Sequence, residues 1–283
     1  MKIKLAGMVT LYNPTNQDIK NIDSYINDID ILYIVDNTEG KSNKHKLPKS
    51  KKIKYIFNNE NKGVGYALNY ACELSIKNGY KYLLTMDQDS KFEKGALKKL
   101  KEVVEKEDMS KYSIVVPWHN TKLKMKKLTL GYDYPETTMT SGNILNLDVW
   151  QEVGGFEEDF FIDGIDIEYS FKTRKKGYKI LRVNSVDMEH NLGDIKYKKI
   201  FNRDIVVSNH NYLRKYYIIR NNHYINDKYK DYSPYLCSSL VSFKRDLFTI
   251  IMYEKDKYKK IRSMIRGYKD YKKGIKGKYR YKK

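Results

Sequence analysis

The chain has 283 residues, of which 41% are apolar and 13% aromatic, and its 55 Lys and Arg residues against 35 Asp and Glu give a formal charge of +20 at pH 7. This length and apolar content allow a full hydrophobic core, which excludes a disordered chain and a small disulfide-dependent scaffold and corresponds to about two domains. Cys72 and Cys237 lie far apart in the chain, which predicts core thiols in a reducing compartment.

The charge and the apolar pattern restrict where the protein acts. No apolar run approaches the roughly 18 residues needed to span a bilayer, so we expect a cytoplasmic protein. The basic excess indicates an anionic partner, which could be nucleic acid, phospholipid headgroups or a phosphate-bearing substrate. Residues 254–283 carry 14 Lys and Arg against three acidic residues and so contribute +11 of the total.

The first half of the chain alternates strands and helices. Apolar runs predict strands over residues 3–11, 31–35, 53–57, 80–86 and 113–117. Apolar residues at helical spacing predict helices starting near residue 15 and covering residues 63–78 and 93–106. The Lys-rich stretch 38–52 is expected to be a loop. This alternation is typical of an α/β fold with a mostly parallel sheet.

The second half changes from mixed to helical. After a polar excursion to about residue 136, residues 138–147 are expected to return to the sheet, and Asp148 to cap a short helix that ends at Gly154. An acidic, aromatic segment then leads into a helix before residue 177 and a strand over 178–183. Helices are predicted over 212–225 and 236–253, the second with one apolar stripe.

Three aspartates follow predicted strands: Asp36, Asp87 and Asp89. Ligands of open α/β sheets bind beyond the carboxyl ends of the strands. The i, i+2 spacing of Asp87 and Asp89 points both carboxylates to one side of an extended chain, where they repel each other unless a cation lies between them. Mg²⁺ or Mn²⁺ would suit this pair and the phosphates of a nucleotide, whereas an isolated Asp-x-Asp also fits a solvated turn.

Two further segments are candidates for the same site. The run from Asn59 to Asn69 has small residues at the start of a helix, where free N–H groups could meet an anion, although a capped helix explains it equally. Asp163, Asp166 and Glu168 lie among large apolar residues, whose burial raises a carboxylate pKa and favours proton abstraction; acids at a helix N-terminus are the alternative.

His190 follows the last predicted strand of this part of the chain. A neutral imidazole there could complete the coordination of a metal ion or contact a diphosphate, and a structural histidine is the alternative.

The order of these motifs resembles family-two glycosyltransferases of the GT-A fold, and among them bacterial rhamnosyltransferases of polysaccharide assembly. The resemblance covers roughly residues 3–225. The motifs that carry it are Val9-Thr10-Leu11-Tyr12-Asn13-Pro14, Val35-Asp36-Asn37, Asn61-Lys62-Gly63, Asp87-Gln88-Asp89-Ser90, Thr140-Ser141-Gly142-Asn143, Phe161-Ile162-Asp163 with Asp166 and Glu168, His190-x-x-Gly193-Asp194 and Tyr216-Tyr217-x-x-Arg220-Asn221.

The resemblance implies a role for each matched position. Asp166 is implied as the catalytic base, and Asp89, Asp87 and His190 as ligands of Mg²⁺ or Mn²⁺. Ser141, Gly142, Asp163 and Glu168 are implied to line the sugar and acceptor site. The implied donor-nucleotide residues are Thr10, Tyr12, Asn13, Asp36, Asn37, Asn61, Gly63, Asn69, Asp87 and Gln88.

The implied reaction is a single, inverting displacement at the anomeric carbon of a nucleotide-sugar donor. Asp166 would deprotonate an acceptor hydroxyl while the metal stabilises charge on the departing nucleoside diphosphate. The expected donor is dTDP-L-rhamnose, with a UDP-hexose or UDP-galactofuranose as the alternative, and the expected acceptor is a saccharide of a lipid-linked cell-surface polysaccharide, such as capsule or cell wall.

We expect two units, a GT-A catalytic domain over residues 1–210 and a helical, basic extension over 211–283. The extension predicts docking on the anionic inner face of the plasma membrane, since basic residues and Tyr favour the headgroup region. Packing on the catalytic domain or on a second subunit, as in a homodimer, is the alternative for its apolar stripe.

Two other classes of function are alternatives to glycosyl transfer. Nucleic-acid binding is disfavoured because no recognised module is present and acidic clusters follow the strands. A catalytically inactive relative that acts only in assembly is disfavoured by the presence of Asp89 and Asp166.

Overall fold

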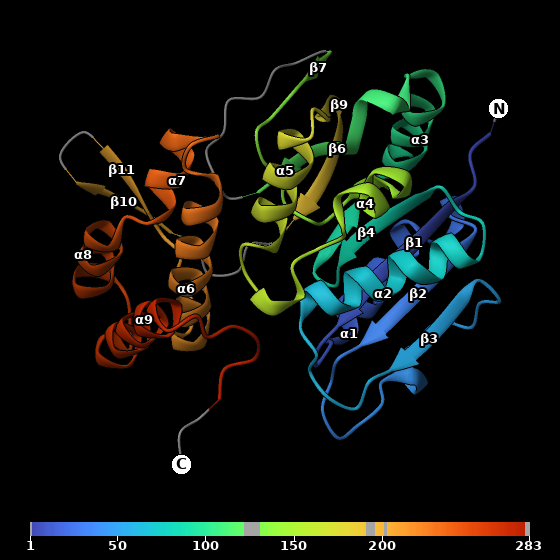
Figure 1. Cartoon of the computed structure of the whole chain (residues 1–283). Coiled ribbons are helices and arrows are strands. Elements are labelled where there is room, and N and C mark those ends of the chain that lie inside the picture. Colours follow the sequence, from blue (N-terminus) through green and yellow to red (C-terminus); the bar gives the residue numbers. More distant parts are fainter. Residues whose placement is uncertain (1, 122–130, 191–195, 201–202, 281–283) are drawn as a thin grey trace.

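A computed structural model describes residues 2–121, 131–190, 196–200 and 203–280 (Figure 1). Its centre is a nine-stranded sheet in the order β3-β2-β1-β4-β8-β6-β9-β5, with β7 paired to β9. The strands are β1 (Leu5–Leu11), β2 (Ile31–Asp36), β3 (Ile53–Phe57), β4 (Tyr82–Asp87), β5 (Ser90–Phe92), β6 (Tyr112–Asn120), β7 (Tyr132–Asp133), β8 (Asn143–Asn146) and β9 (Lys179–His190).

The sheet is parallel in one half and mixed in the other. Strands β3, β2, β1 and β4 run parallel, as predicted. The apolar side chains of β1, β2 and β4 are mostly buried on both faces, whereas those of the edge strand β3 are partly buried. Strand β8 pairs antiparallel with β4 and β6, and β5 and β7 pair antiparallel with β9. The carboxyl ends of β1, β2 and β4 therefore meet at one edge, which carries Thr10, Asp36 and Asp87.

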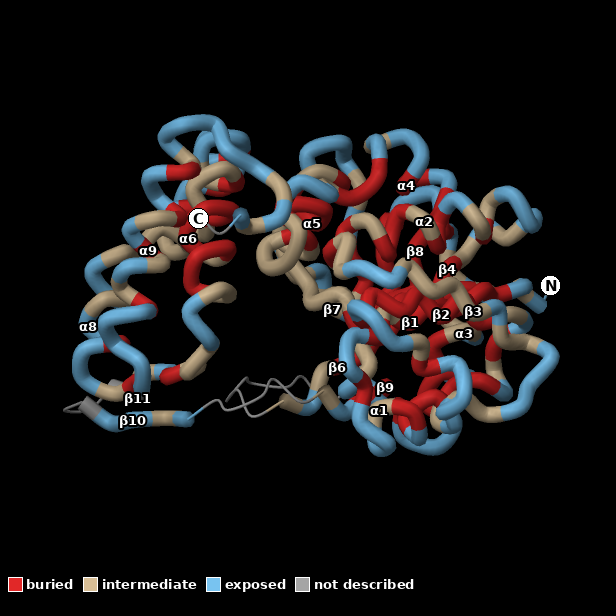
Figure 2. The backbone as a smooth tube through the Cα atoms, turned by 90° about the horizontal axis from the view of Figure 1, so that it is seen from below, coloured by how far each residue is buried: buried red, intermediate tan, exposed pale blue. Residues whose placement is uncertain are grey.

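Helices cover both faces of the sheet and create two hydrophobic layers (Figure 2). The first layer lies under α1 (Asn16–Asn21) and α3 (Ala96–Lys106), and the second under α2 (Val64–Lys77), α4 (Leu147–Val153) and α5 (Ile165–Lys175). The helix predicted from residue 15 ends at Asn21 and continues as 3-10 turns at Ile22–Ser24 and Ile26–Asp28. Asn146, rather than Asp148, caps α4.

The predicted strand over 178–183 is longer than expected. Strand β9 runs to His190, so this residue ends a strand instead of following one by seven residues. The predicted polar excursion falls partly on residues 122–130, outside the described residues.

The C-terminal part consists of the hairpin β10 (Lys196–Ile200) and β11 (Arg203–Val207) and of the helices α6 (Tyr212–Tyr229), α7 (Pro234–Leu240), α8 (Phe243–Tyr253) and α9 (Lys257–Lys272). The single helix predicted over 236–253 is thus two helices, with a break at Val241 and Ser242. Ile225, Tyr229 and Cys237 are buried in the second layer of the sheet domain, so this part does not have a wholly separate core. Cys72 and Cys237 are buried free thiols.

Helices α6, α8 and α9 are joined by buried charges. Glu254, at the end of α8, pairs with Lys215 at 3.0 Å and with Lys260 at 2.9 Å, and all three residues are buried. Removing one member of such a group would leave a buried charge without a partner, so the group fixes how the three helices pack. Within the described part of the chain, no helix has both the length and the apolar character to cross a membrane.

One contact connects the start of α2 with the loop before α5. Gly63 has φ +90° and ψ 167°, which L side chains rarely adopt, and a Cβ there would lie 2.6 Å from the Phe161 carbonyl oxygen. That oxygen accepts a 2.7 Å hydrogen bond from the Val64 N–H. The glycine thus allows the loop containing residues 161–164 to lie against the helix start.

We expect Gly63→Ala to destabilise the protein by about 3 kcal/mol, because it combines backbone strain with a clash against main-chain atoms. Gly79→Ala is the matched control: Gly79 has φ +77°, but a Cβ there meets nothing within 4 Å, so the cost should be about 1 kcal/mol. Urea denaturation of both variants measures the difference. Equal losses of unfolding free energy would contradict the steric role of Gly63.

Candidate active site

The carboxyl-end edge of the sheet borders a cavity of about 790 Å³. Thr10 and Tyr12 from the end of β1 and Asp87 to Asp89 from the end of β4 line one side. Residues 162–166, at the start of α5, also line the cavity, as do residues 208–211 and Arg214 around the start of α6. Asp89 and Asp166 therefore face the same cavity.

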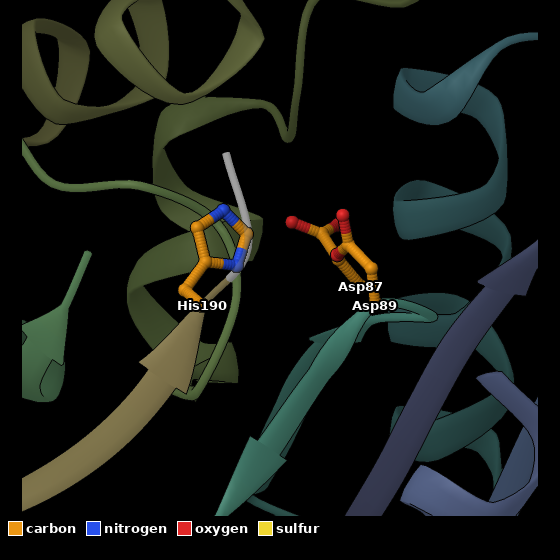
Figure 3. Close-up of side chains that lie close together, drawn as sticks. All are labelled: Asp87, Asp89 and His190. Carbon is orange, nitrogen blue, oxygen red and sulfur yellow. The ribbon is translucent and has the colours of Figure 1, made fainter. Parts of the chain in front are cut away.

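Asp87, Asp89 and His190 form a possible metal site at this cavity (Figure 3). One ligand atom from each residue lies within 4.8 Å of the other two. Asp87 ends β4, Asp89 lies in the turn after it, and the imidazole comes from the end of β9, so the antiparallel pairing of β5 with β9 brings them together. Two carboxylate oxygens and an imidazole nitrogen suit Mn²⁺ or Mg²⁺, with further positions open to a ligand.

The electrostatics of the two aspartates suit the binding of a divalent cation. Burial raises the pKa of Asp87, and the neighbouring Asp89 charge raises it further, against opposing effects of His190 and Arg214. Burial also raises the pKa of Asp89. A divalent cation bound to both carboxylates would offset the burial and the repulsion between them.

Groups behind these ligands hold them in place. Ser90 Oγ is hydrogen-bonded to His190 Nδ1, which leaves Nε2 as the ring nitrogen for a cation. Ser141 Oγ accepts a 3.0 Å hydrogen bond from the Asp87 N–H, and the Ser141 carbonyl lies 2.7 Å from His119 Nε2. Burial lowers the pKa of His119 to about 4, so this ring is neutral near pH 7.

Asp166 lies in the first turn of α5, half-buried, and lines the cavity. Its Oδ1 accepts a 2.9 Å hydrogen bond from the Ile167 N–H. Burial raises its pKa to about 6, and the charges of Asp163 and Asp87 act in the same direction. A carboxylate of this kind is a stronger proton acceptor than an ordinary aspartate and is still ionised at pH 7.

Asp163 and Arg214, which both line the cavity, form an ion pair. Arg214 donates from Nη2 to Oδ1 at 2.5 Å and from Nε to Oδ2 at 3.2 Å. Asp163 was predicted to contact sugar, but its carboxylate is engaged by this guanidinium. Sequence reasoning missed Arg214 and His210, which also lines the cavity, because both lie at the predicted boundary of the extension. In the sequence, the available signal for Arg214 was its position in the first turn of the helix predicted over residues 212–225.

Several predicted nucleotide residues lie at the cavity or just behind it. Thr10, Tyr12 and Gln88 line it, and the Gln88 side chain is held by the Tyr12 main chain, accepting from its N–H at 2.8 Å. Asn13, with φ +49°, donates its N–H to Thr38 Oγ1 at 2.9 Å.

At the start of α2, Asn61 Oδ1 accepts from the Gly63 N–H at 3.0 Å. With the Val64 N–H also bonded to Phe161, the start of α2 is capped by protein groups, contrary to the expected free anion site.

Asp36 and Asn37 are buried in a network next to the site. Burial raises the pKa of Asp36, but hydrogen bonds from Tyr55, Thr38 and Asn43 outweigh this effect and the pKa is lower than usual. Asn37 donates to the Gly63 carbonyl at 3.1 Å. Neither residue lines the cavity described above, so their predicted contact with the nucleoside is not visible in this arrangement.

Four other predicted site residues have structural partners instead. Asn69 is buried and bonds the main chain of Phe156. Glu168 is buried and accepts from Lys228 Nζ and Tyr229 Oη, each at 2.7 Å, which connects α5 to α6.

Ser141 lies behind Asp87 rather than in the cavity, as does Gly142, whose N–H donates to the Thr85 carbonyl at 2.7 Å. We therefore omit all four from the proposed ligand contacts. Gly193 and Asp194 lie outside the described residues.

We expect Asp166→Asn to stabilise the protein at pH 7.5 by about 1 to 2 kcal/mol. The folded-state pKa of about 6 lies above the ordinary 3.8, so the folded protein holds this proton more tightly and loses stability as the pH rises from about 4 to 6. The amide lacks this penalty. Denaturant unfolding at pH 4 and 7.5 measures the gain, which should be small at pH 4. Asp148→Asn, at an exposed position, is the control, and an equal gain at both pH values would contradict the burial effect.

Comparison with known proteins places the chain in a family. The model of glycosyl transferase family 2 matches residues 19–164, which is more than half of the chain. The dTDP-rhamnosyl transferase RfbF of Shigella flexneri is 26% identical over 240 residues, covering 78% of this chain and 79% of that protein.

Solved structures show the same fold at low identity. TarS 1-349 of S. aureus, in complex with UDP-GlcNAc, has a TM-score of 0.61 and 12% identity over 96% of this chain and 82% of that one. GalNAc-T7 with UDP, GalNAc and Mn²⁺ has a TM-score of 0.59 and 12% identity; the match covers 96% of this chain but only 56% of GalNAc-T7. The predicted GT-A fold is confirmed by these similarities. The chain is a glycosyltransferase and belongs to glycosyl transferase family 2.

Proposed function

We propose that the protein is an inverting, metal-dependent glycosyltransferase that moves L-rhamnose from dTDP-rhamnose to a hydroxyl of a saccharide acceptor. The observation that carries this proposal is that Asp166 lies on the same cavity as Asp87, Asp89 and His190. The similarity to the Shigella dTDP-rhamnosyl transferase supports the choice of donor.

The chemistry needs a base on one side of the sugar and a stabilised leaving group on the other. Asp166 accepts the proton of the acceptor hydroxyl as that oxygen forms its bond to the anomeric carbon. The bond from this carbon to the donor phosphate breaks with its electron pair on the diphosphate, and attack opposite the leaving group inverts the configuration. A cation held by Asp87, Asp89 and His190 would supply Lewis-acid stabilisation of the diphosphate.

A uridine-nucleotide donor is the specific alternative to dTDP-rhamnose in this proposal. Both TarS and GalNAc-T7 were solved with uridine nucleotides, so a UDP-hexose or UDP-galactofuranose donor would use the same chemistry. Thr10, Tyr12 and Gln88 are the described residues that we assign to the nucleotide side of the cavity.

The acceptor approaches Asp166 from a second cavity in this proposal. A smaller cavity of about 270 Å³ also borders Asp166 and Met139 and is lined by Trp118, Thr138 and Arg182. Its aromatic and hydroxyl groups suit a saccharide, which we propose is carried on a lipid and becomes part of a cell-surface polysaccharide.

The outer helices α8 and α9 support binding to an anionic membrane. Exposed apolar side chains, Phe248, Ile251 and Met252 on α8 and Ile265 on α9, lie in the same pair of packed helices as the basic residues of the C-terminal segment. Apolar contact with the headgroup region and attraction to anionic lipid reinforce each other. We propose that this face holds the enzyme at the inner membrane surface, where a lipid-linked acceptor is available.

Two variants separate the roles of the base and the metal site. We expect Asp166→Asn to reduce transfer by at least 10³-fold while dTDP affinity in the presence of Mn²⁺ changes little, because the nucleotide binds on the other side of the sugar. Asp89→Ala should abolish the dependence of dTDP binding on Mn²⁺. Calorimetry of nucleotide binding and chromatographic measurement of product from dTDP-rhamnose report both effects.

Equal loss of binding and turnover in Asp166→Asn would contradict the assignment of the base. Unchanged turnover of the native enzyme in a chelator would contradict the metal requirement. Rapid transfer from UDP-sugars with none from dTDP-rhamnose would support the alternative donor.

We expect the Arg262→Glu, Lys269→Glu double variant to bind phosphatidylglycerol vesicles at least tenfold more weakly, since each basic group near an anionic surface contributes about 1 kcal/mol. Both residues are exposed on α9. Lys98→Glu, Lys99→Glu on α3 makes the same change of charge at a distant exposed position and serves as the control. Vesicle flotation measures binding. Equal weakening in the two variants would show non-specific attraction and contradict the docking face.

A further inference from the structure

The cavity contains little positive charge for an enzyme with a formal charge of +20. Four carboxylates line it, those of Asp87, Asp89, Asp163 and Asp166. Among the residues that the structure describes, Arg214 is the only Lys or Arg in the lining. The basic excess of the chain therefore lies elsewhere, and any direct contact between a cationic side chain of the described lining and a diphosphate must come from Arg214.

The ion pair with Asp163 fixes the orientation of this guanidinium. Nε and Nη2 are bonded to the two oxygens of Asp163, whose side chain is 12% exposed. The Arg214 side chain is 40% exposed and lines the cavity. A guanidinium has five N–H donors in one plane, so the edge that Asp163 does not occupy keeps donors for a second anion.

The backbone makes this arrangement rigid. Asp163 has φ +63° and is followed by Gly164, with φ +81°, at the start of α5. Asn221 of α6 donates to the carbonyl oxygens of Ile162 and Asp163 at 2.9 and 2.8 Å, so the helix that carries Arg214 also holds the loop that carries its partner. Asn211 caps the same helix by accepting from the Arg214 N–H at 2.9 Å.

We propose that Arg214 binds the diphosphate of the donor and stabilises the negative charge that develops on it when the glycosidic bond breaks, with Asp163 as the residue that positions the guanidinium. This inference rests on the proposed function, because it assumes a nucleoside diphosphate leaving group. Charge on that group rises in the transition state, so a fixed cation next to it favours the transition state over the bound donor. Planar, paired N–H groups match phosphate oxygens better than an ammonium group does.

The experiment compares Arg214→Gln, Arg214→Lys and Asp163→Asn by calorimetry with dTDP and Mn²⁺, with thymidine, and by turnover with dTDP-rhamnose. We expect Arg214→Gln to weaken dTDP binding about 10- to 100-fold and to lower kcat about 10²- to 10³-fold, while thymidine binding is unchanged. Arg214→Lys should recover part of both losses. Asp163→Asn keeps the cation and should bind dTDP within a few-fold of the native protein, with a lower kcat. Arg174→Gln, which removes an arginine paired with Glu136 away from the cavity, is the matched control and should leave all three values unchanged.

The outcomes distinguish this inference from the proposed function. If the native protein binds neither dTDP nor UDP with Mn²⁺, the proposed function fails. If it binds dTDP and Arg214→Gln binds equally well, or if Asp163→Asn reproduces every loss of Arg214→Gln, then Arg214 is only one half of a structural ion pair and the inference is overturned. Thermal unfolding of each variant confirms that the comparison is made between folded proteins.

Discussion

The chemistry of the cavity depends on the repulsion between the carboxylates that the fold brings together there. Asp87 ends β4 and Asp89 lies just after it, and Asp163 and Asp166 reach the same cavity from the start of α5. Burial and mutual repulsion disfavour ionisation of Asp87 and Asp166 and raise the pKa of each. The Arg214 contact with Asp163 relieves one part of this repulsion, and the cation proposed to bind Asp87 and Asp89 would relieve another. Within the described part of the chain, Asp166 has a main-chain hydrogen bond but no ion pair, which suits its proposed role as a base.

The surrounding structure keeps these groups close at a cost in stability. The loop that contains Phe161 and Asp163 has two non-glycine residues with positive φ, and Gly63 gives it space against α2. Buried hydrogen bonds from Asn221 to the carbonyl oxygens of this loop compensate for that strain. The helical part is therefore needed for the geometry of the site, even though much of its outer surface is exposed (Figure 2).

Sequence patterns predicted the elements that local chemistry determines. Strands β2 and β4 are apolar runs that end in Asp36 and Asp87, and the helix over residues 64–77 has one small, apolar face. The residues of the candidate metal site were also predictable, since Asp87 and Asp89 come at the end of such a strand. Its geometry was not, because the pairing of Ser90 with His190 joins residues 100 positions apart.

The sequence did not predict which groups the polar side chains contact in the folded protein. Glu168 and Asn69 occupy positions that match the family motifs, yet tertiary contacts with Tyr229 and with the Phe156 main chain give them structural roles. Arg214 shows the opposite case, because its role depends on α6 lying across the cavity from β4. The domain boundary expected at residue 210 falls among the residues that line this cavity.

The proposed metal-dependent transfer is tested most directly by anomalous diffraction from crystals of the protein grown with Mn²⁺ and dTDP. If the proposal is right, a manganese peak lies between the side chains of Asp87, Asp89 and His190, with the diphosphate on the cavity side of the ion and the Asp166 carboxylate facing the place where the sugar of the donor would lie. A manganese peak at another place, or a diphosphate bound away from this cavity, would contradict it.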